Sequence, residues 1–92
     1  KHTVEKGPMP AYPHSVSWSD KHGKGIYEIH VQKNGTVSEV KILQRSGDDL
    51  FDRIAVETLQ TWRLYRGPLI IELPLIFHLT PSHYSVGVPK KR

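Results

Sequence analysis

The chain has 92 residues, of which 37% are hydrophobic and 24% charged, and it contains no cysteine. This length predicts one domain with a modest core. The lack of cysteine excludes disulfide scaffolds, thiolate metal centres and cysteine nucleophiles. Neither a run of about 18 apolar residues nor a signal-peptide pattern occurs, so no transmembrane helix is predicted. The net charge is +4, but basic and acidic residues are mixed, which argues against nucleic-acid binding.

The N-terminal segment, residues 1–11, is predicted to be an extended arm. Pro8 and Pro10 interrupt regular strand pairing and favour polyproline-like geometry. Residues 14–22 could then form a short helix that a proline precedes and Gly23 ends. Little apolar surface is available to pack such a helix.

A β-hairpin is predicted next. Residues 26–33 alternate between apolar and polar, which is typical of a half-buried strand. Asn34-Gly35 follows, and this pair is the strongest short-range hairpin signal because it tolerates the positive φ angles of a type I′ turn. The returning strand covers residues 36–44, where the parity of Val37 differs from that of the later apolar residues and indicates a bulge or an offset. The predicted buried face of the first strand carries Tyr27, Ile29 and Val31.

The main helix is predicted to start after a Ser-Gly break. Asp48 or Asp49 can cap its N-terminus, and acidic residues in the first turn suit the helix dipole. Arg63 and Arg66 suit its last turn, and Gly67-Pro68 would end it. Apolar residues recur at helical spacing at Leu50, Ile54, Ala55, Leu59 and Trp62.

The last strand is predicted over residues 69–79, and residues 80–92 form a tail with little core-forming content. Because Pro74 cannot donate a ladder hydrogen bond, this strand should lie at an edge of the sheet. One face carries Leu73, Leu75, Phe77 and Leu79, and the other carries Ile70, Glu72, Pro74, Ile76 and His78.

The order strand, strand, helix, strand defines an α+β fold of two layers. We expect a three-stranded antiparallel sheet in the order 2-1-3, with one main helix on one face and a short helix before the first strand. The domain is expected over residues 12–79, between the arm and the tail. Apolar residues on the other face (Ile26, Leu43, Ile70 and Ile76) and an open edge favour strand addition, or else a cover formed by the arm or the tail.

Catalytic and metal-binding patterns are weak. The six histidines lack metal-site spacing; His30 and His78 could meet on neighbouring strands, but solvent-facing polar residues are the simpler interpretation. The cluster of Asp48, Asp49 and Asp52 is more typical of helix capping than of acid–base catalysis. We therefore expect no enzyme activity, no cofactor and no metal.

Six motifs in order resemble the C-terminal domain of TonB, the energy-transducing protein of Gram-negative bacteria, over residues 8–79. They are Pro10-Ala11-Tyr12-Pro13, Gly25 before the first strand, Asn34-Gly35-Thr36-Val37, Ser46-Gly47 leading to Leu50-Phe51-Asp52, Trp62-Arg63-Leu64, and Leu73-Pro74-Leu75-Ile76-Phe77-His78-Leu79.

The resemblance implies a periplasmic domain, anchored to the inner membrane by a segment outside this chain, that works with ExbB and ExbD. It would bind the TonB box of outer-membrane receptors as a strand added beside the last strand, and drive uptake of siderophore-iron, haem or cobalamin. The implied contact residues are Met9, Pro10, Tyr12, Ile70, Glu72, Pro74, Ile76 and His78.

Two other functions stay open at this stage. A TonB- or TolA-like domain of another envelope machine would bind a different protein or peptidoglycan, and an open edge could also pair with a second copy as a homodimer. Nucleic-acid binding by the sheet is disfavoured, because Tyr27 and Phe77 are predicted to point toward the helix and not outward for base stacking.

Overall fold

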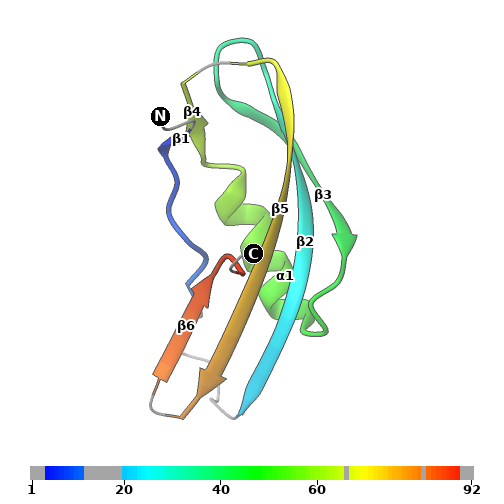
Figure 1. Ribbon diagram of the computed structural model, residues 1–92, viewed down its shortest axis with the longest axis vertical. Coiled ribbons are helices and arrows are strands. Elements are labelled where there is room, and N and C mark those ends of the chain that lie inside the picture. Colours follow the sequence, from blue (N-terminus) through cyan, green and yellow to red (C-terminus); the bar gives the residue numbers. More distant parts are fainter. Residues whose placement is uncertain (1–3, 12–19, 66, 82, 90–92) are drawn as a thin grey trace.

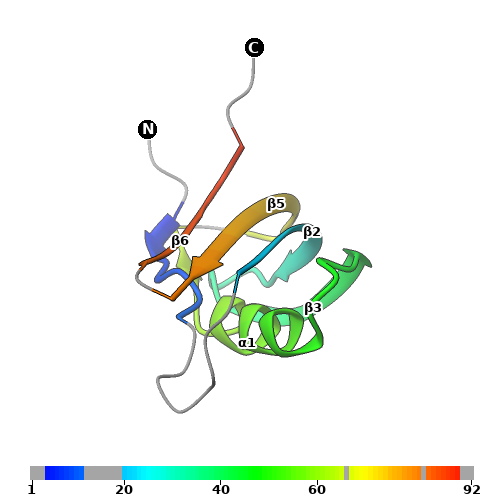
Figure 2. The same cartoon turned by 90° about the horizontal axis from the view of Figure 1, so that it is seen from below.

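A computed structural model of the protein describes residues 4–11, 20–65, 67–81 and 83–89. Its elements in chain order are β1 (Val4–Lys6), β2 (Lys21–Val31), β3 (Val37–Gln44), α1 (Asp49–Leu59), β4 (Arg63–Leu64), β5 (Leu69–Thr80) and β6 (His83–Gly87), shown in Figure 1. Four of the strands form an antiparallel sheet in the order β3-β2-β5-β6, and β1 pairs separately with β4. The helix α1 covers one face of the large sheet (Figure 2). Within the described residues, no helix has the length and apolar character needed to cross a bilayer.

The predicted α+β class, with an antiparallel sheet and one main helix, is confirmed. The predicted number of strands was wrong, because β6 adds a fourth strand beside β5. Its residues were assigned to a tail with little core-forming content, yet Tyr84 and Val86 pack against the core. The short helix predicted over residues 14–22 falls mostly outside the described residues, and its last two residues belong to β2.

The β2–β3 hairpin is confirmed, but its turn differs from the predicted type. The backbone bonds Gln32 N to Thr36 O (2.8 Å) and Gly35 N to Gln32 O (2.9 Å) enclose three loop residues. Gly35 has a φ of 92°, whereas Asn34 does not have a positive φ, so the turn is not type I′. The pairing of β2 with β3 shifts register just after this turn, which confirms the expected irregularity near Val37.

The helix begins where predicted but ends earlier. Asp48 is the N-cap, and its side chain accepts a hydrogen bond from Leu50 N at 3.3 Å. Shorter-range bonds from Thr61 N to Thr58 O and from Trp62 N to Leu59 O close the last turn. Arg63 therefore lies in β4 and not in the helix, and Arg66 lies outside the described residues.

The core lies between α1 and the sheet. Phe51 of the helix stacks on Phe77 of β5 at a ring-centroid distance of 4.1 Å. Tyr27 reaches beneath the helix, where its hydroxyl donates to Asp52 Oδ1 at 2.7 Å. A Cβ atom at Gly25 would collide with the Tyr27 hydroxyl, so glycine at that position allows this ring placement. The fully buried apolar core consists of Tyr27, Ile29, Val31, Phe51, Ala55, Leu59, Trp62, Leu64, Leu75, Phe77 and Leu79.

Candidate partner-binding edge

The edge of β5 that faces away from β2 is covered along only part of its length. The strand β6 pairs with residues 76–80 of β5, from Ile76 opposite Gly87 to Thr80 opposite His83. In Figure 1, β6 lies beside only the C-terminal half of β5. No strand in the described part of the chain pairs with residues 69–75 on this side. We call residues 69–75 the open half-edge and residues 76–80 the covered half-edge.

The prediction that β5 lies at the edge of the sheet was therefore wrong for its C-terminal half. Only two residues separate Thr80 from His83, and the residues that flank such a short hairpin loop form a hydrogen-bonded pair. Thr80 thus directs its backbone groups toward β6. Since β5 pairs with β2 without a bulge, every second residue back from Thr80 points the same way.

Two prolines explain where the covered half-edge ends. Extending the register between β5 and β6 by two residues places Pro89 opposite Pro74. Neither proline has an N–H group, so this pair cannot exchange ladder hydrogen bonds. Beyond Pro74, the backbone N–H and C=O groups of Glu72 and Ile70 point away from β2. These are the groups that an added strand would use.

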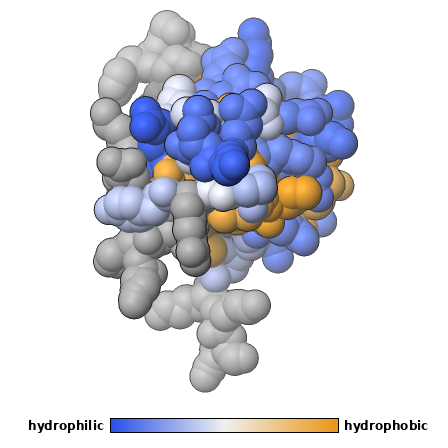
Figure 3. Space-filling view, turned by 90° about the horizontal axis from the view of Figure 1, so that it is seen from above, coloured by the Kyte–Doolittle hydropathy of each residue, from blue (hydrophilic) through white to orange (hydrophobic). Residues whose placement is uncertain are grey.

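The open half-edge also carries apolar surface. The Ile70 side chain is 62% exposed on the face opposite α1, and it pairs across the strands with His30. Seen from the end of the molecule where β5 begins, an apolar cluster interrupts a mostly hydrophilic surface (Figure 3). A shallow depression at this end is lined by His30, Val31, Ser38, Pro68, Leu69 and Ile70.

The end of the arm contacts β6, whereas β1, at its start, pairs with β4. Pro10 is fully buried, and its carbonyl accepts a hydrogen bond from the Tyr84 hydroxyl at 2.8 Å. Two residues earlier, the Pro8 carbonyl accepts a bond from Trp62 Nε1, also at 2.8 Å. Met9, between these anchors, is 40% exposed. Tyr12, the third predicted contact residue of the arm, lies outside the described residues.

The predicted contact residues therefore fall into three places. Ile70, Glu72 and Pro74 lie on the open half-edge, and Ile76 and His78 lie where β6 already pairs. Pro10 lies beside the Tyr84 side chain of β6, and Met9 precedes it in the arm. The structure thus divides the predicted surface instead of presenting it as one continuous strand.

His30 and His78, which could have met on neighbouring strands, lie far apart. His30 pairs with Ile70, eight positions along β5 from His78, which corresponds to roughly 27 Å of strand. His30 instead lies 2.8 Å from Glu28 Oε1, and His78 makes an edge-to-face contact with His22 at a centroid distance of 6.2 Å. In the described residues, no three potential metal-ligating side chains come together.

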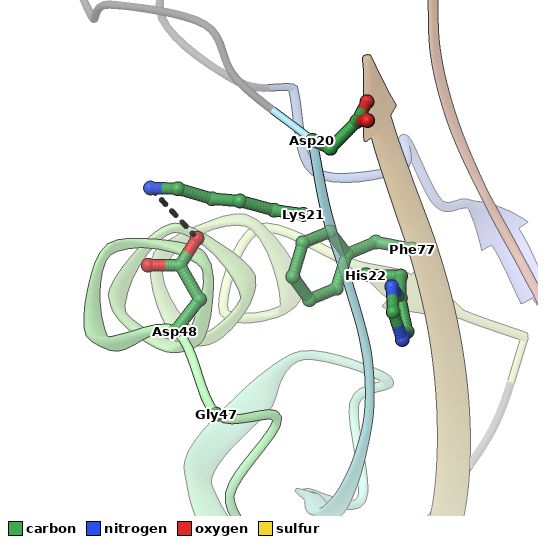
Figure 4. A pocket seen from close by; sticks show the side chains of 6 residues that line it. All are labelled: Asp20, Lys21, His22, Gly47, Asp48 and Phe77. Carbon is green, nitrogen blue, oxygen red and sulfur yellow. Dashed lines mark ion pairs between the residues drawn. The ribbon is translucent and has the colours of Figure 1, made fainter.

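A second depression lies at the start of α1 (Figure 4), lined by Asp20, Lys21, His22, Gly47, Asp48 and Phe77. The Asp48 carboxylate caps the helix and lies 4.0 Å from Lys21 Nζ. Its oxygens are therefore used in structural contacts. This arrangement agrees with the capping interpretation of the acidic cluster and offers no paired carboxylates for proton transfer.

Sequence reasoning missed the contribution of Tyr84, which connects β6 to the arm. The signal that could have revealed it is the alternation of Tyr84 and Val86 with polar or small residues directly after a Pro-Ser pair. Such a short alternating run after a turn pair is typical of the second strand of a hairpin.

Comparison with known proteins agrees with this architecture. The model of the family described as Gram-negative bacterial TonB protein C-terminal matches residues 8–79. No match was found among curated proteins or among solved structures. The matched range runs from the anchored arm to the end of β5, and it includes the whole open half-edge. The chain therefore belongs to the TonB C-terminal family, as a TonB-like periplasmic domain.

Proposed function

We propose that this domain binds the TonB box of an outer-membrane receptor as an extended strand beside β5, on the open half-edge. The domain acts as a non-enzymatic connector. Through a parent chain anchored in the inner membrane, it passes energy from ExbB and ExbD to the receptor, for uptake of siderophore-iron, haem or cobalamin. The family supports a receptor as the partner.

One observation carries the proposal: in the described part of the chain, residues 69–75 of the inner strand β5 have no partner strand on the side away from β2, although β6 pairs with the rest of that side. The backbone groups of Ile70 and Glu72 point outward there, and Ile70 offers an exposed apolar side chain beside them. In strand addition, main-chain hydrogen bonds supply affinity and alternate side chains supply selectivity. The edge provides both.

The test uses a substitution that removes one outward N–H group and little else. Glu72→Pro deletes the donor on the side away from β2, so the ladder with β2 keeps its bonds, as it does at Pro74. Glu72→Ala is the matched control, because it loses the same exposed side chain but keeps the donor. Binding of synthetic TonB-box peptides to the full chain is measured by calorimetry.

We expect Glu72→Pro to weaken peptide binding by about 2- to 12-fold relative to Glu72→Ala, the range of roughly one net hydrogen bond. Circular dichroism must show that both variants are folded. Equal affinities in the two folded variants would place the peptide elsewhere. If no TonB-box peptide binds the unmodified chain, a TonB- or TolA-like role with another envelope partner becomes the better hypothesis.

A homodimer through the same edge is a competing use of the same backbone groups. Two copies cannot add a receptor strand while their open half-edges pair with each other. Sedimentation of the chain over a range of concentrations, with and without peptide, separates these uses. We expect peptide binding to leave the chain monomeric.

A further inference from the structure

The covered half-edge and the arm are joined through one side chain. Tyr84 lies in β6 opposite Leu79 of β5, on the helix side of the sheet, and its hydroxyl donates to the Pro10 carbonyl. Burial raises the pKa of its hydroxyl to about 12, and like any tyrosine hydroxyl it is a protonated donor at neutral pH. This hydrogen bond links Pro10 to β6.

The strand β6 has properties that would allow another strand to take its place beside β5. It contains five residues, β5 is its one partner among the described strands, and its ladder is stopped by the two facing prolines. Its inward side chains, Tyr84 and Val86, pack against the core without belonging to the fully buried set. Three pairs of its register with β5 (Ile76–Gly87, His78–Ser85 and Thr80–His83) are placed to exchange ladder hydrogen bonds, so its removal breaks at most six backbone bonds.

The chemistry of β6 indicates which strand could replace it. The positions opposite Leu79 and Phe77 accept an aromatic and a β-branched side chain, two residues apart, and the position between them holds the exposed Ser85. A replacing strand therefore needs two apolar side chains that alternate with small or polar residues. Since the open half-edge continues into the covered half-edge, a strand that starts on the first can extend onto the second.

We infer that Tyr84 couples the sheet edge to the arm: a partner strand that extends past Pro74 and displaces β6 also frees Pro10 and Met9 for contact with the partner. This inference rests on the proposed strand addition and deepens it. Trp62 still holds the Pro8 carbonyl, so the arm would swing from Pro8 and remain attached near the docked strand.

The first test needs no partner and uses the full chain. Ser85→Pro removes an N–H group that points at β5, and should detach β6; Ser85→Ala keeps that group and is the matched control. Tyr84→Phe removes only the hydroxyl, with Tyr65→Phe as its control, because Tyr65 is 62% exposed. The backbone order parameters of Met9 and Ala11 are measured by NMR relaxation, and amide hydrogen exchange is measured for β6; the Trp62 indole N–H signal is the internal reference.

We expect Ser85→Pro and Tyr84→Phe to lower the order parameters of Met9 and Ala11 from about 0.85 to below about 0.6, while both controls and the Trp62 signal stay unchanged. Tyr84→Phe should leave the β6 amides protected. Unchanged order parameters of Met9 and Ala11 in a Ser85→Pro variant whose β6 amides do exchange rapidly would overturn the coupling.

A second measurement separates failure of the coupling from failure of the proposed function. TonB-box peptides are titrated into the unmodified chain and into Tyr84→Phe. If binding releases the arm, Tyr84→Phe should bind about two- to tenfold more tightly, because one bond no longer has to break. Equal affinities, with unshifted Met9 and Ala11 signals, refute the coupling and leave strand addition standing. If no peptide binds, the proposed function fails, and the order parameters of Met9 and Ala11 alone decide whether β6 holds the arm.

Discussion

The buried contact between Tyr27 and Asp52 ties the helix to the sheet, and its removal should be costly. Both residues are almost fully buried, and Asp52 also accepts hydrogen bonds from Ser46 N at 3.1 and 3.3 Å. A hydrogen bond to a carboxylate contributes about 1.5–3 kcal/mol net, whereas a buried donor that is left without an acceptor costs about 1–3 kcal/mol. The network therefore allows the two ends of one bond to be tested separately.

We expect Tyr27→Phe to reduce the free energy of unfolding by about 2 kcal/mol, since Asp52 keeps its bonds from Ser46. Asp52→Ala should cost about 4 kcal/mol, because the Tyr27 hydroxyl and the Ser46 N–H both lose their acceptor. In a domain of this size, the smaller change lowers the melting temperature by roughly 8–16 °C. The double variant should cost less than the sum of the two single variants.

Urea unfolding followed by tryptophan fluorescence measures these free energies. The control is Asp49→Ala, a first-turn carboxylate that is 98% exposed and lies 3.5 Å from Arg45, for which we expect at most about 0.5 kcal/mol. A cost below about 0.5 kcal/mol for Tyr27→Phe, or strict additivity in the double variant, would refute the reasoning.

Two further predictions concern the hairpin turn and alkaline pH. Gly35→Ala should destabilise the fold by more than about 2 kcal/mol in the same unfolding assay, because Gly35 has a φ of 92° and an added Cβ would also collide with the Leu64 carbonyl. The control is Gly47→Ala, which should cost only the backbone penalty of about 1–2 kcal/mol, because Gly47 has a φ of 100° but no atom within 4 Å of an added Cβ. Equal costs of the two substitutions would contradict this prediction. Burial, with help from Asp52 at Tyr27, raises the pKa of Tyr27 and Tyr84, the latter to about 12. As the pH rises, the unfolded chain releases these protons first, near pH 10. The free energy of unfolding is therefore retained below pH 10, and above pH 10 it falls by about 1.4 kcal/mol per pH unit for each tyrosine. Tyr84→Phe should halve this slope, and a free energy of unfolding that stays constant from pH 10 to 12 would contradict the prediction.

Local signals predicted much of the fold. Alternation in β2 and the Asn34-Gly35 pair located the hairpin, and an aspartate after a Ser-Gly break located the start of α1. The end of the helix was not predictable in the same way. Arg63 and Gly67-Pro68 fit a helix terminus locally, but Leu64 N bonds to Gly35 O at 2.8 Å, so a contact distant in sequence draws this segment into β4.

The candidate site was predicted only in part, for a related reason. Pro74 correctly indicated a position on β5 without a partner strand on the side away from β2, and it lies near the end of the open half-edge, residues 69–75. The tail gave too little apolar sequence to indicate a strand, since β6 depends on an existing edge for pairing. Two side chains anchor the arm from far along the chain: Tyr84 bonds to Pro10, 74 positions earlier, and Trp62 bonds to Pro8, 54 positions earlier. No local pattern encodes such contacts.

The central claim is that a receptor strand adds to the open half-edge, and the most direct measurement is a backbone amide NMR titration of the full chain with TonB-box peptides. We predict that the signals of Ile70 and Glu72 shift first, and that those of residues 76–80 follow only with peptides that reach past Pro74. Shifts confined to the opposite edge of the sheet, at β3, or the absence of shifts in a folded sample, would contradict the account.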